Sequence, residues 1–425
     1  MSGVPRGMAL VAQSGGPTAV INASACGVIQ EALRQPNIAG VLGANRGILG
    51  ALEEDLFDLA AESAETINGL LSTPSAAIGS CRYKLGSLVN DRAKYERLLA
   101  VFQAHNIRHF FYIGGNDSMD TADKVHQLAR ESGYDLRVIG IPKTIDNDLP
   151  ITDHCPGYGS VAKFMATATM EAGRDTEAMF TFDAVTLIEA MGRNTGWIAA
   201  ACGLARRDER DAPQLVYVPE IPFNLDRFLG DVDDVIRRLG GACVVVSEGL
   251  KDASGEYLRA ETGSFGSDRF GHRQLGGVAE YLKELIEARL KVKARFNKLG
   301  TCQRNAIHWA SLTDSREAYL CGQEAVRQAV SGSSGVMITL ERVSQNPYEC
   351  RTGTVPLREV ANKVKYLPRE YMNAAGNHIS QAMRDYASPL IQGTVPIRMG
   401  EDGLPIFVRF RRQSVPKRLP EWKAP

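Results

Sequence analysis

Two apolar runs near the middle of the first half of the chain each break abruptly into small and charged residues. They occupy residues 110–118 and 139–148, and the apolar part of each has the length and composition of a strand. Between them, apolar residues recur at helical spacing over 119–132. The pattern predicts strand, loop, helix, strand and loop. Parallel strands joined in this way place both loops at the carboxyl edge of one sheet, where α/β proteins bind ligands.

The same alternation runs along most of the chain. Residues 8–12 form an apolar run that ends in a glycine turn at 13–18, and helical periodicity follows over 19–35. Further apolar runs at 184–190, 215–218, 242–246 and 335–340 alternate with helical patterns. Beyond about residue 355 the pattern predicts a largely helical segment. The predicted fold class is therefore α/β with mostly parallel sheets.

The predicted loops carry the chemistry of a phosphoryl-transfer site. Gly114 and Gly115 stand before a helix start, where backbone amides can bind an anion. The second loop supplies the cation Lys143 and the carboxylates Asp146 and Asp148. Glycines that hold phosphate, a cation that neutralises it and a carboxylate that takes a proton are the parts that such a reaction needs.

Composition limits the other possibilities. Lys plus Arg and Asp plus Glu both number 49 in 425 residues, so the chain has no electrostatic footprint for nucleic acid or an anionic membrane surface. It has no run of 18 apolar residues, and residues 1–7 lack the apolar core of a signal peptide, so we expect a cytoplasmic protein. None of its eight cysteines lies within 18 positions of another, so the spacing predicts free thiols rather than a zinc site.

Taken in order, these motifs resemble those of the 6-phosphofructokinase family, over roughly residues 8–340. Asp117 with Lys143 is similar to the pyrophosphate-dependent branch, because the ATP-dependent branch typically has glycine at both positions. The motifs that carry the resemblance are Ser14-Gly15-Gly16, Gly79-Ser80-Cys81-Arg82, Gly114-Gly115-Asn116-Asp117-Ser118, Pro142-Lys143-Thr144-Ile145-Asp146-Asn147-Asp148, Met191-Gly192-Arg193, Glu248 and Gly300-Thr301-Cys302-Gln303-Arg304.

The resemblance implies two Rossmann-like lobes with the active site in the cleft between them. Residues 1–157, completed by part of 303–355, would form the donor lobe, and 158–302 would form the sugar-phosphate lobe. Residues 356–425 would be a C-terminal extension. The implied reaction moves a phosphoryl group reversibly from pyrophosphate to the 1-hydroxyl of fructose 6-phosphate.

It also implies roles for particular residues. Asp146 would be the general base, Lys143 would stabilise the transferring phosphoryl group, and Asp117 would exclude the α-phosphate of ATP. The expected donor-binding residues are Gly15, Gly16, Arg82, Gly115, Asp117 and Ser118. The expected sugar-phosphate-binding residues are Thr144, Asp146, Asp148, Met191, Gly192, Arg193, Glu248, Arg295, Thr301 and Arg304.

Some positions depart from the family pattern. Asn116 stands where an aspartate usually holds Mg²⁺, so the expected Mg²⁺ would depend on Asn116 weakly and on Asp117. Ala184 and Thr301 replace residues that bind the sugar phosphate in many relatives, and Asn45 replaces an aromatic residue that often contacts adenine. The family also implies a homo-oligomer, with a dimer favoured, in which Arg295 reaches a neighbouring subunit's site.

Three alternatives remain open at this point. The first is an ATP-dependent 6-phosphofructokinase, against which Asp117 and Lys143 argue. The second is a non-catalytic regulatory subunit that binds sugar phosphates, although such a chain would be expected to lose the base or the lysine. The third is a sugar or lipid-type kinase that shares only the Gly-Gly loop, against which Met191-Gly192-Arg193 and Gln303-Arg304 argue.

Overall fold

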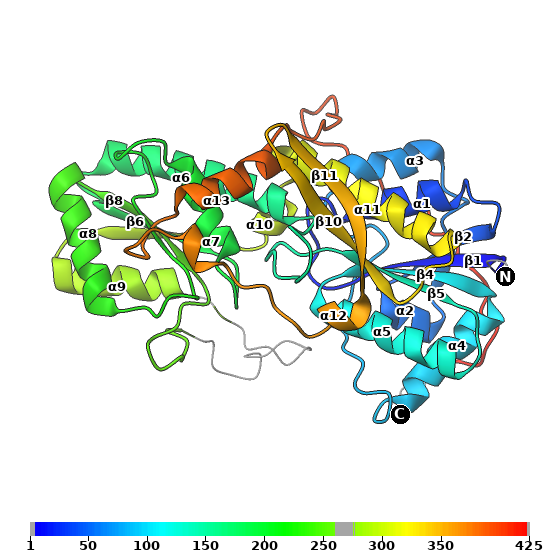
Figure 1. Ribbon diagram of the computed structural model, residues 1–425. Coiled ribbons are helices and arrows are strands. Elements are labelled where there is room, and N and C mark those ends of the chain that lie inside the picture. The colour runs from blue at the N-terminus through cyan, green and yellow to red at the C-terminus, as the bar shows by residue number, and fades with distance from the viewer. Residues whose placement is uncertain (1–4, 260–274, 276, 423–425) are drawn as a thin grey trace.

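The computed structural model describes residues 5–259, 275 and 277–422, and Figure 1 shows two lobes, each built on its own sheet. In the described residues one sheet has seven strands and the other has four. The α/β class and the mostly parallel sheets are confirmed.

The seven-stranded sheet has the order β11-β10-β5-β4-β1-β2-β3. Its middle strands pair in parallel, and the strands β3 and β11 pair antiparallel at the two edges. The elements of this lobe are β1 (Gly7–Gln13), α1 (Ile21–Ala32), β2 (Ile38–Ala44), α2 (Ile48–Glu53), β3 (Leu56–Asp58), α3 (Ala64–Gly69), α4 (Arg92–Ala104), β4 (Ile107–Gly114), α5 (Asn116–Glu131), β5 (Arg137–Pro142), α11 (Leu312–Val330), β10 (Val336–Gln345), β11 (Tyr348–Pro356) and α12 (Leu357–Val360).

The four-stranded sheet has the order β7-β8-β6-β9, and all of its pairs are parallel. The elements of this lobe are α6 (Tyr158–Met179), β6 (Val185–Ala190), α7 (Trp197–Cys202), β7 (Leu215–Tyr217), α8 (Leu225–Leu239), β8 (Ala242–Ser247), α9 (Val278–Leu290), β9 (Ala294–Lys298), α10 (Cys302–Asn305) and α13 (Gln381–Ala387).

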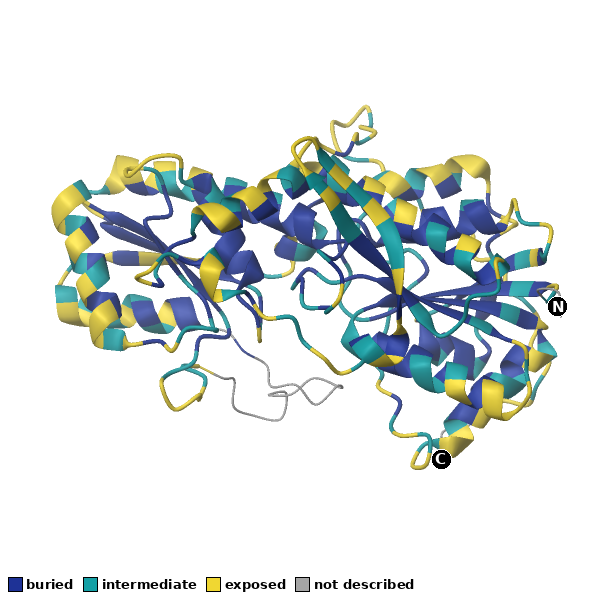
Figure 2. Ribbon diagram, in the orientation of Figure 1, coloured by how far each residue is buried: buried dark blue, intermediate teal, exposed yellow. Residues whose placement is uncertain are grey.

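Helices cover both faces of each sheet, so the central strands are buried on both sides (Figure 2). In β4, Phe110 and Tyr112 pack toward α4 and α5, whereas Phe111 and Ile113 pack toward α1 and α11. This alternation of side chains is the period of a strand, and it explains why β4 reads as a continuous apolar run rather than as a polar–apolar alternation.

The topology brings the predicted loops together. β1, β4 and β5 are adjacent and parallel, so the loops after Gln13, Gly114 and Pro142 leave the same edge of the larger sheet. In the smaller sheet β6 and β8 are adjacent and parallel, and they lead into Met191 and Glu248. The predicted strand–loop–helix–strand–loop around residue 114 is confirmed by β4, α5 and β5.

The prediction of a largely helical segment beyond residue 355 is wrong. In the described part of that segment only α12, α13 and two short 3₁₀ helices, Arg369–Tyr371 and Ser388–Ile391, are helical. Prolines at 356, 368, 389, 396, 405, 416 and 420 interrupt the segment, and proline cannot donate the backbone bond that a helix interior needs. The segment instead crosses between the two lobes, as its orange and red trace in Figure 1 shows.

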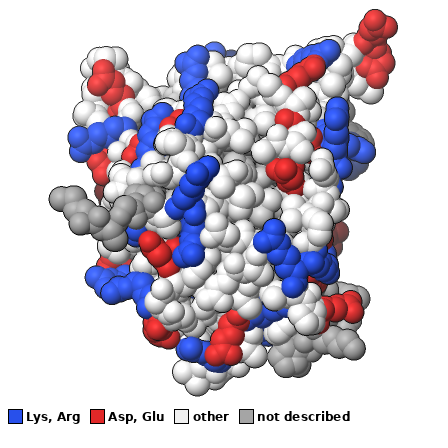
Figure 3. Space-filling view, turned by 90° about the vertical axis from the view of Figure 1, so that its right-hand side faces the viewer, with Lys and Arg blue, Asp and Glu red and all other residues white. Residues whose placement is uncertain are grey.

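Surface charge and helix length agree with the composition. Figure 3 shows the end of the larger lobe, where basic and acidic side chains are interspersed on the visible face. Among the described helices, none has both the length and the apolar character that crossing a membrane requires.

Candidate active site

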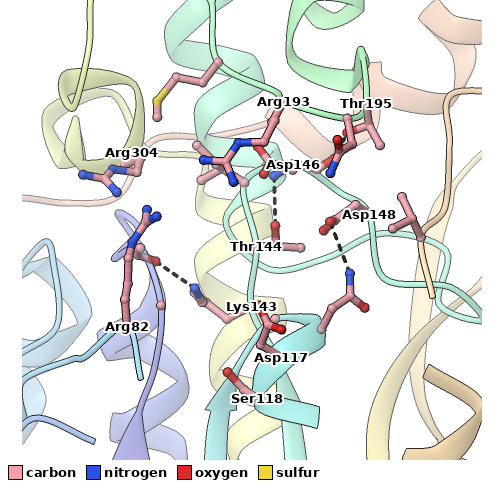
Figure 4. Close-up of a pocket in the computed structure, with 18 of the residues that line it drawn as sticks. Arg82, Asp117, Ser118, Lys143, Thr144, Asp146, Asp148, Arg193, Thr195 and Arg304 are labelled. Atoms are coloured by element: carbon pink, nitrogen blue, oxygen red, sulfur yellow. Dashed lines mark hydrogen bonds between the residues drawn. The ribbon is translucent and has the colours of Figure 1, made fainter. Parts of the chain in front are cut away.

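A cleft of about 360 Å³ lies between the lobes, at the carboxyl edges of both sheets. Figure 4 shows side chains from both lobes pointing into it. Its lining residues are Gly15, Gly16, Arg82, Lys84, Gly115, Asn116, Asp117, Ser118, Lys143, Thr144, Ile145, Asp146, Asp148, Met191, Arg193, Asn194, Thr195, Glu248, Arg304, Asn362 and Val364.

Lys143 connects two of the predicted loops. Its ammonium donates a 2.7 Å hydrogen bond to the carbonyl oxygen of Gly16, in the loop after β1. Gly15 adopts a φ of +76°, and a Cβ there would lie 3.3 Å from the Lys143 ammonium. Glycine is therefore required on conformational grounds, and its small size also keeps the lysine close to the loop. The Gly15 amide itself donates to the carbonyl of Cys81, so it is not a spare donor for an anion.

Arg304 and Arg82 add positive charge on the same side of the cleft, where Figure 4 shows them facing each other. A Cβ on Gly16 would lie 2.8 Å from an Arg304 guanidinium nitrogen, so glycine leaves room for this side chain. Within the described residues the Arg304 Nε has no hydrogen-bond partner. Burial, followed by the charge of Arg82, lowers the pKa of Arg304. A buried donor beside a like charge is suited to an anionic ligand.

The N-terminus of α5 forms the floor of the cleft. Gly115 precedes the helix, and Asp117 and Ser118 lie in its first turn. The Asp117 carboxylate forms an ion pair with Lys84, with an N–O distance of 2.8 Å. The Lys84 side chain is 40% exposed and that of Asp117 is 23% exposed, so the pair lies at the mouth of the cleft. It joins the loop that carries Arg82 to the helix start.

Asp146 and Asp148 are close enough to influence each other's ionisation. Burial, together with the negative charges of Asp148 and Glu248, raises the pKa of Asp146 to about 7. Burial also raises the pKa of Asp148. The Asp146 backbone is fixed on both sides, since its amide donates to Thr144 Oγ1 at 3.1 Å and its carbonyl accepts from Thr195 Oγ1 at 3.1 Å. A carboxylate that titrates near neutral pH and points into a cleft is well matched to general-base catalysis.

The pKa of Lys143 is shifted in the opposite direction, below its ordinary value. It is 4% exposed, and burial lowers its pKa to about 8 even though Asp146 and Asp148 oppose that shift. The ammonium and the Asp146 carboxylate thus titrate within a narrow range on the same loop.

The smaller lobe contributes the loop after β6. Gly192 has a φ of +126°, and a Cβ there would lie 2.4 Å from the carbonyl of Thr195, so only glycine fits. The amide of Gly192 donates to Glu248 at 3.2 Å, and the amide of Met191 donates to the side chain of Gln303 at 2.9 Å. These two bonds fix the backbone that presents Arg193 to the cleft.

The C-terminal segment supports the loop that carries Asp146. The Lys365 ammonium donates to the carbonyls of Thr152 and Asp153 at 3.1 and 2.9 Å. The backbone amide of Lys365 donates to the carbonyl of Asp148 at 2.8 Å. Asn147 donates from its side chain to Tyr386 Oη at 2.8 Å. Both partners, Lys365 and Tyr386, come from beyond residue 356.

Most of the predicted residues line this one cleft, but three do not. Gly192 acts through its backbone, as described above. Thr301 is exposed at the start of α10 and is not among the described residues that line the cleft. Arg295 is exposed on β9, where it forms an ion pair with Asp183, also outside its own chain's cleft. The predicted contact of Arg295 with a neighbouring subunit's site stays a prediction.

Sequence reasoning missed several lining residues. Lys84 shares a loop with Arg82, and that shared loop was the only signal for it. Asn194 and Thr195 follow the Met191-Gly192-Arg193 motif directly. Asn362 and Val364 come from the C-terminal segment, and nothing in the local sequence marks them as part of a site.

The expected Mg²⁺ site was tested against the donor atoms near Asn116. Its side-chain nitrogen donates to Asp148 at 3.3 Å, whereas its buried Oδ1 has no partner among the described residues. An unpaired amide oxygen beside carboxylates is a suitable ligand for a hard cation. The residues present therefore fit a divalent ion.

A cleft between two α/β lobes, with carboxylates facing clustered cations, is the arrangement that a phosphotransferase needs. The family model for phosphofructokinase matches residues 8–329, and the chain belongs to that family. The chain is 49% identical, over 98% of its own length and 99% of the relative's, to a pyrophosphate–fructose 6-phosphate 1-phosphotransferase of Xanthomonas campestris pv. campestris.

Two further comparisons concern a solved structure and an ATP-dependent relative. A crystal structure of a pyrophosphate-dependent phosphofructokinase from Marinobacter aquaeolei matches with a TM-score of 0.89 and 44% identity, over 98% of this chain and all of the other. An ATP-dependent 6-phosphofructokinase of Amycolatopsis methanolica is 31% identical, but over only 62% of this chain and 55% of its own. The prediction of the pyrophosphate-dependent branch is confirmed.

Proposed function

We propose that this chain transfers a phosphoryl group reversibly from pyrophosphate to the 1-hydroxyl of fructose 6-phosphate, giving fructose 1,6-bisphosphate and phosphate. The observation that carries the proposal is the placement of Asp146 and Lys143 on one loop, with the lysine hydrogen-bonded to Gly16 in the loop after β1. Near-full-length relatives that carry the name of this activity support it.

Asp146 accepts the proton of the attacking hydroxyl. Because its pKa lies near neutrality, the side chain is substantially ionised at physiological pH and is still basic enough to take a proton. The proton moves from the sugar oxygen to the Asp146 carboxylate as that oxygen bonds to phosphorus. The bond between phosphorus and the bridging oxygen of pyrophosphate breaks, and phosphate leaves.

Lys143 and Arg304 stabilise the negative charge on the transferring group and the leaving phosphate. Their positions at the Gly16 loop let them bind oxygens that bear charge in the transition state. Arg193, held by the Met191–Gly192 backbone, faces the cleft from the sugar-phosphate side, where a guanidinium can bind two phosphate oxygens at once.

Asp117 sets the size of the donor. Its carboxylate and the Lys84 ammonium occupy the α5 side of the cleft, where the further phosphate and nucleoside of ATP would have to pass. Pyrophosphate has neither group and would not need that region. The ion pair therefore favours the short donor by occupying space that a longer one needs.

Mg²⁺ would be held by Asn116 Oδ1 and Asp117, both of which line the cleft. When bound, the ion neutralises donor charge and makes the phosphorus more open to attack.

We also propose a cytoplasmic homodimer in which Arg295 completes the partner's sugar-phosphate site. From Arg295 to Lys298, the edge strand β9 is exposed, and Phe182 (59% exposed) and Phe296 (38% exposed) add apolar surface beside it. In this assembly the lobe of the seven-stranded sheet, including β10 and β11, binds the donor. The lobe of the four-stranded sheet binds the sugar phosphate.

The test is a donor panel. Purified protein with Mg²⁺ and fructose 6-phosphate is given pyrophosphate, ATP or ADP, and fructose 1,6-bisphosphate is measured. Product is expected with pyrophosphate and little or none with ATP, and Asp146→Asn serves as the matched inactive control. Robust turnover with ATP but not with pyrophosphate would overturn the donor assignment. Equal activity in the Asp146→Asn protein would overturn the site.

A further inference from the structure

A second cluster of ligand-type side chains lies outside the cleft, in the larger lobe. His154 comes from the segment after the catalytic loop, Glu317 from α11 and Cys350 from β11. One ligand atom from each residue, an imidazole nitrogen, a carboxylate oxygen and a thiol sulfur, lies within 4.8 Å of the others. The three residues are more than 30 positions apart, so cysteine spacing in the sequence could not reveal them.

We propose that His154, Glu317 and Cys350 form a binding site for a thiophilic divalent cation such as Zn²⁺. Nitrogen, sulfur and carboxylate oxygen are the ligands that this ion prefers, and three protein ligands leave a fourth tetrahedral position for water. The site would join the end of the catalytic loop to α11 and β11. It is distinct from the Mg²⁺ site, which offers only oxygen.

The surroundings of the three residues match those of a metal site. His154 Nε2 faces Glu317 Oε2, and its other nitrogen, Nδ1, lies 2.7 Å from Asp153 Oδ2. A carboxylate that accepts the second N–H of a ligating histidine is the usual way of orienting the ring. Asp153 is itself held by Arg342 at 3.0 Å.

Glu317 is oriented in the same manner. The Tyr348 hydroxyl donates a 2.6 Å hydrogen bond to Oε1, which leaves Oε2 for the ligand position. His154 is 1% exposed and Glu317 is 6% exposed, so neither is a solvated surface charge. Cys350 is only partly buried, and this gives an ion a route from solvent.

The main cost of binding is a small opening of the cluster. His154 Nε2 and Glu317 Oε2 are 2.6 Å apart, whereas ligands about 2.0–2.1 Å from a tetrahedral ion are roughly 3.3 Å apart. The two atoms must therefore separate by about 0.7 Å, which a glutamate side chain can supply by rotation. The shared proton on His154 Nε2 must leave at the same time.

Binding of the ion also requires the ligands to lose their protons. Thiol and imidazole ligands bind a divalent ion only when deprotonated, so the ion displaces the proton of the Cys350 thiol and any proton on the imidazole nitrogen that faces Glu317.

The experiment uses the full chain, freed of metal by chelation and kept in excess Mg²⁺ so that oxygen sites are saturated. Co²⁺ is added as a spectroscopic probe. We expect a thiolate-to-cobalt absorption band that saturates at one equivalent. Zn²⁺ should then abolish the band, and direct Zn²⁺ addition to the metal-free protein at pH near 7.5 should release protons.

Variants assign the site. Cys350→Ser should remove the band, whereas Cys302→Ser, a matched change at an exposed cysteine outside the cluster, should keep it. Tyr348→Phe keeps all three ligands and should weaken binding about 10–100-fold, as loss of an orienting partner does in metal sites. Absence of a band at stoichiometric Co²⁺, or a band that persists in Cys350→Ser, would overturn the proposal. Full-affinity binding by Tyr348→Phe would overturn the orienting role assigned to the Tyr348 hydroxyl.

Discussion

Lys365→Met tests whether the C-terminal segment positions the catalytic loop. Methionine has a similar length but cannot donate to the carbonyls of Thr152 and Asp153, which the Lys365 ammonium contacts at 3.1 and 2.9 Å. The same ammonium lies 5.2 Å from the centre of the Trp197 ring. The backbone bond from Lys365 to Asp148 is not changed by the substitution.

The magnitude follows from these contacts. A hydrogen bond to a charged group contributes about 1.5–3 kcal/mol, so the two shorter ones represent a gross loss of about 3–6 kcal/mol, and the third bond, to Asn147 Oδ1 at 3.5 Å, is long enough to add little. The lysine also bears a desolvation cost, since burial lowers its pKa. Because that cost disappears with the charge, we expect the free energy of unfolding to fall by a net of about 2–4 kcal/mol.

The effect on catalysis should exceed the effect on substrate binding. The freed carbonyls at 152 and 153 lie within seven residues of Asp146, and a base displaced by about 1 Å can cost on the order of 10²-fold in kcat. Urea unfolding, kcat and KM are measured for Lys365→Met and for Lys363→Met, an exposed lysine two residues away that pairs only with Glu359 in the described structure. If a folded Lys365→Met enzyme kept the kcat of the Lys363→Met control, the positioning role would be refuted.

Four other outcomes are expected. Asp146→Asn should reduce kcat in both directions by about 10²–10⁴-fold with little change in sugar-phosphate binding measured by calorimetry, and more than about a tenth of wild-type kcat would exclude it as the base. The pH profile of kcat/KM should be bell-shaped: it rises through about 7 because Asp146 must lose its proton, and it falls above about 8 because Lys143 must keep its own. A profile flat from 6 to 9 would contradict both assignments. Asp117→Gly should admit ATP weakly and lower kcat/KM for pyrophosphate, while Lys143→Gly should lower pyrophosphate activity without creating ATP activity. If the Asp117→Gly enzyme were as unable to use ATP as its parent, another group would have to exclude the nucleotide. Mixing inactive Asp146→Asn and Arg295→Ala proteins should restore activity through hybrid sites. If subunits demonstrably exchanged and no activity returned, the result would contradict a shared site.

The sequence predicted those parts of the molecule that local pattern determines. The strand, loop, helix and strand around Gly115 follow from an apolar run, a glycine break and helical spacing, and the fold places them as expected. The meeting of the cleft loops at one edge could be predicted because parallel strands align their carboxyl ends. Lys143 and Asp146 could be picked out because both lie in the loop that begins directly after such a strand.

The parts that failed depend on long-range contacts. The pattern beyond 355 predicts helices, yet the described segment forms few of them, because prolines interrupt it and many of its hydrogen bonds go to the two lobes. Lys365 bonds to carbonyls more than 200 positions earlier, and Asn362 donates to Asp120 on α5. A hydrogen bond to a backbone carbonyl cannot be predicted from the sequence, since every residue offers the same acceptor.

The Asp117–Lys84 pair shows how such a contact changes a chemical argument. Considered alone, Asp117 would exclude ATP chiefly by charge, because an unpaired carboxylate repels an α-phosphate. With Lys84 2.8 Å away, much of that charge is compensated, and a half-exposed ion pair contributes only about 0–1 kcal/mol on its own. In the proposed function, exclusion of ATP would then come mainly from volume and from the need to separate the pair before a nucleotide can enter. Donor choice would depend on two side chains on different loops, and a substitution at Asp117 would also remove the ion-pair partner of Lys84.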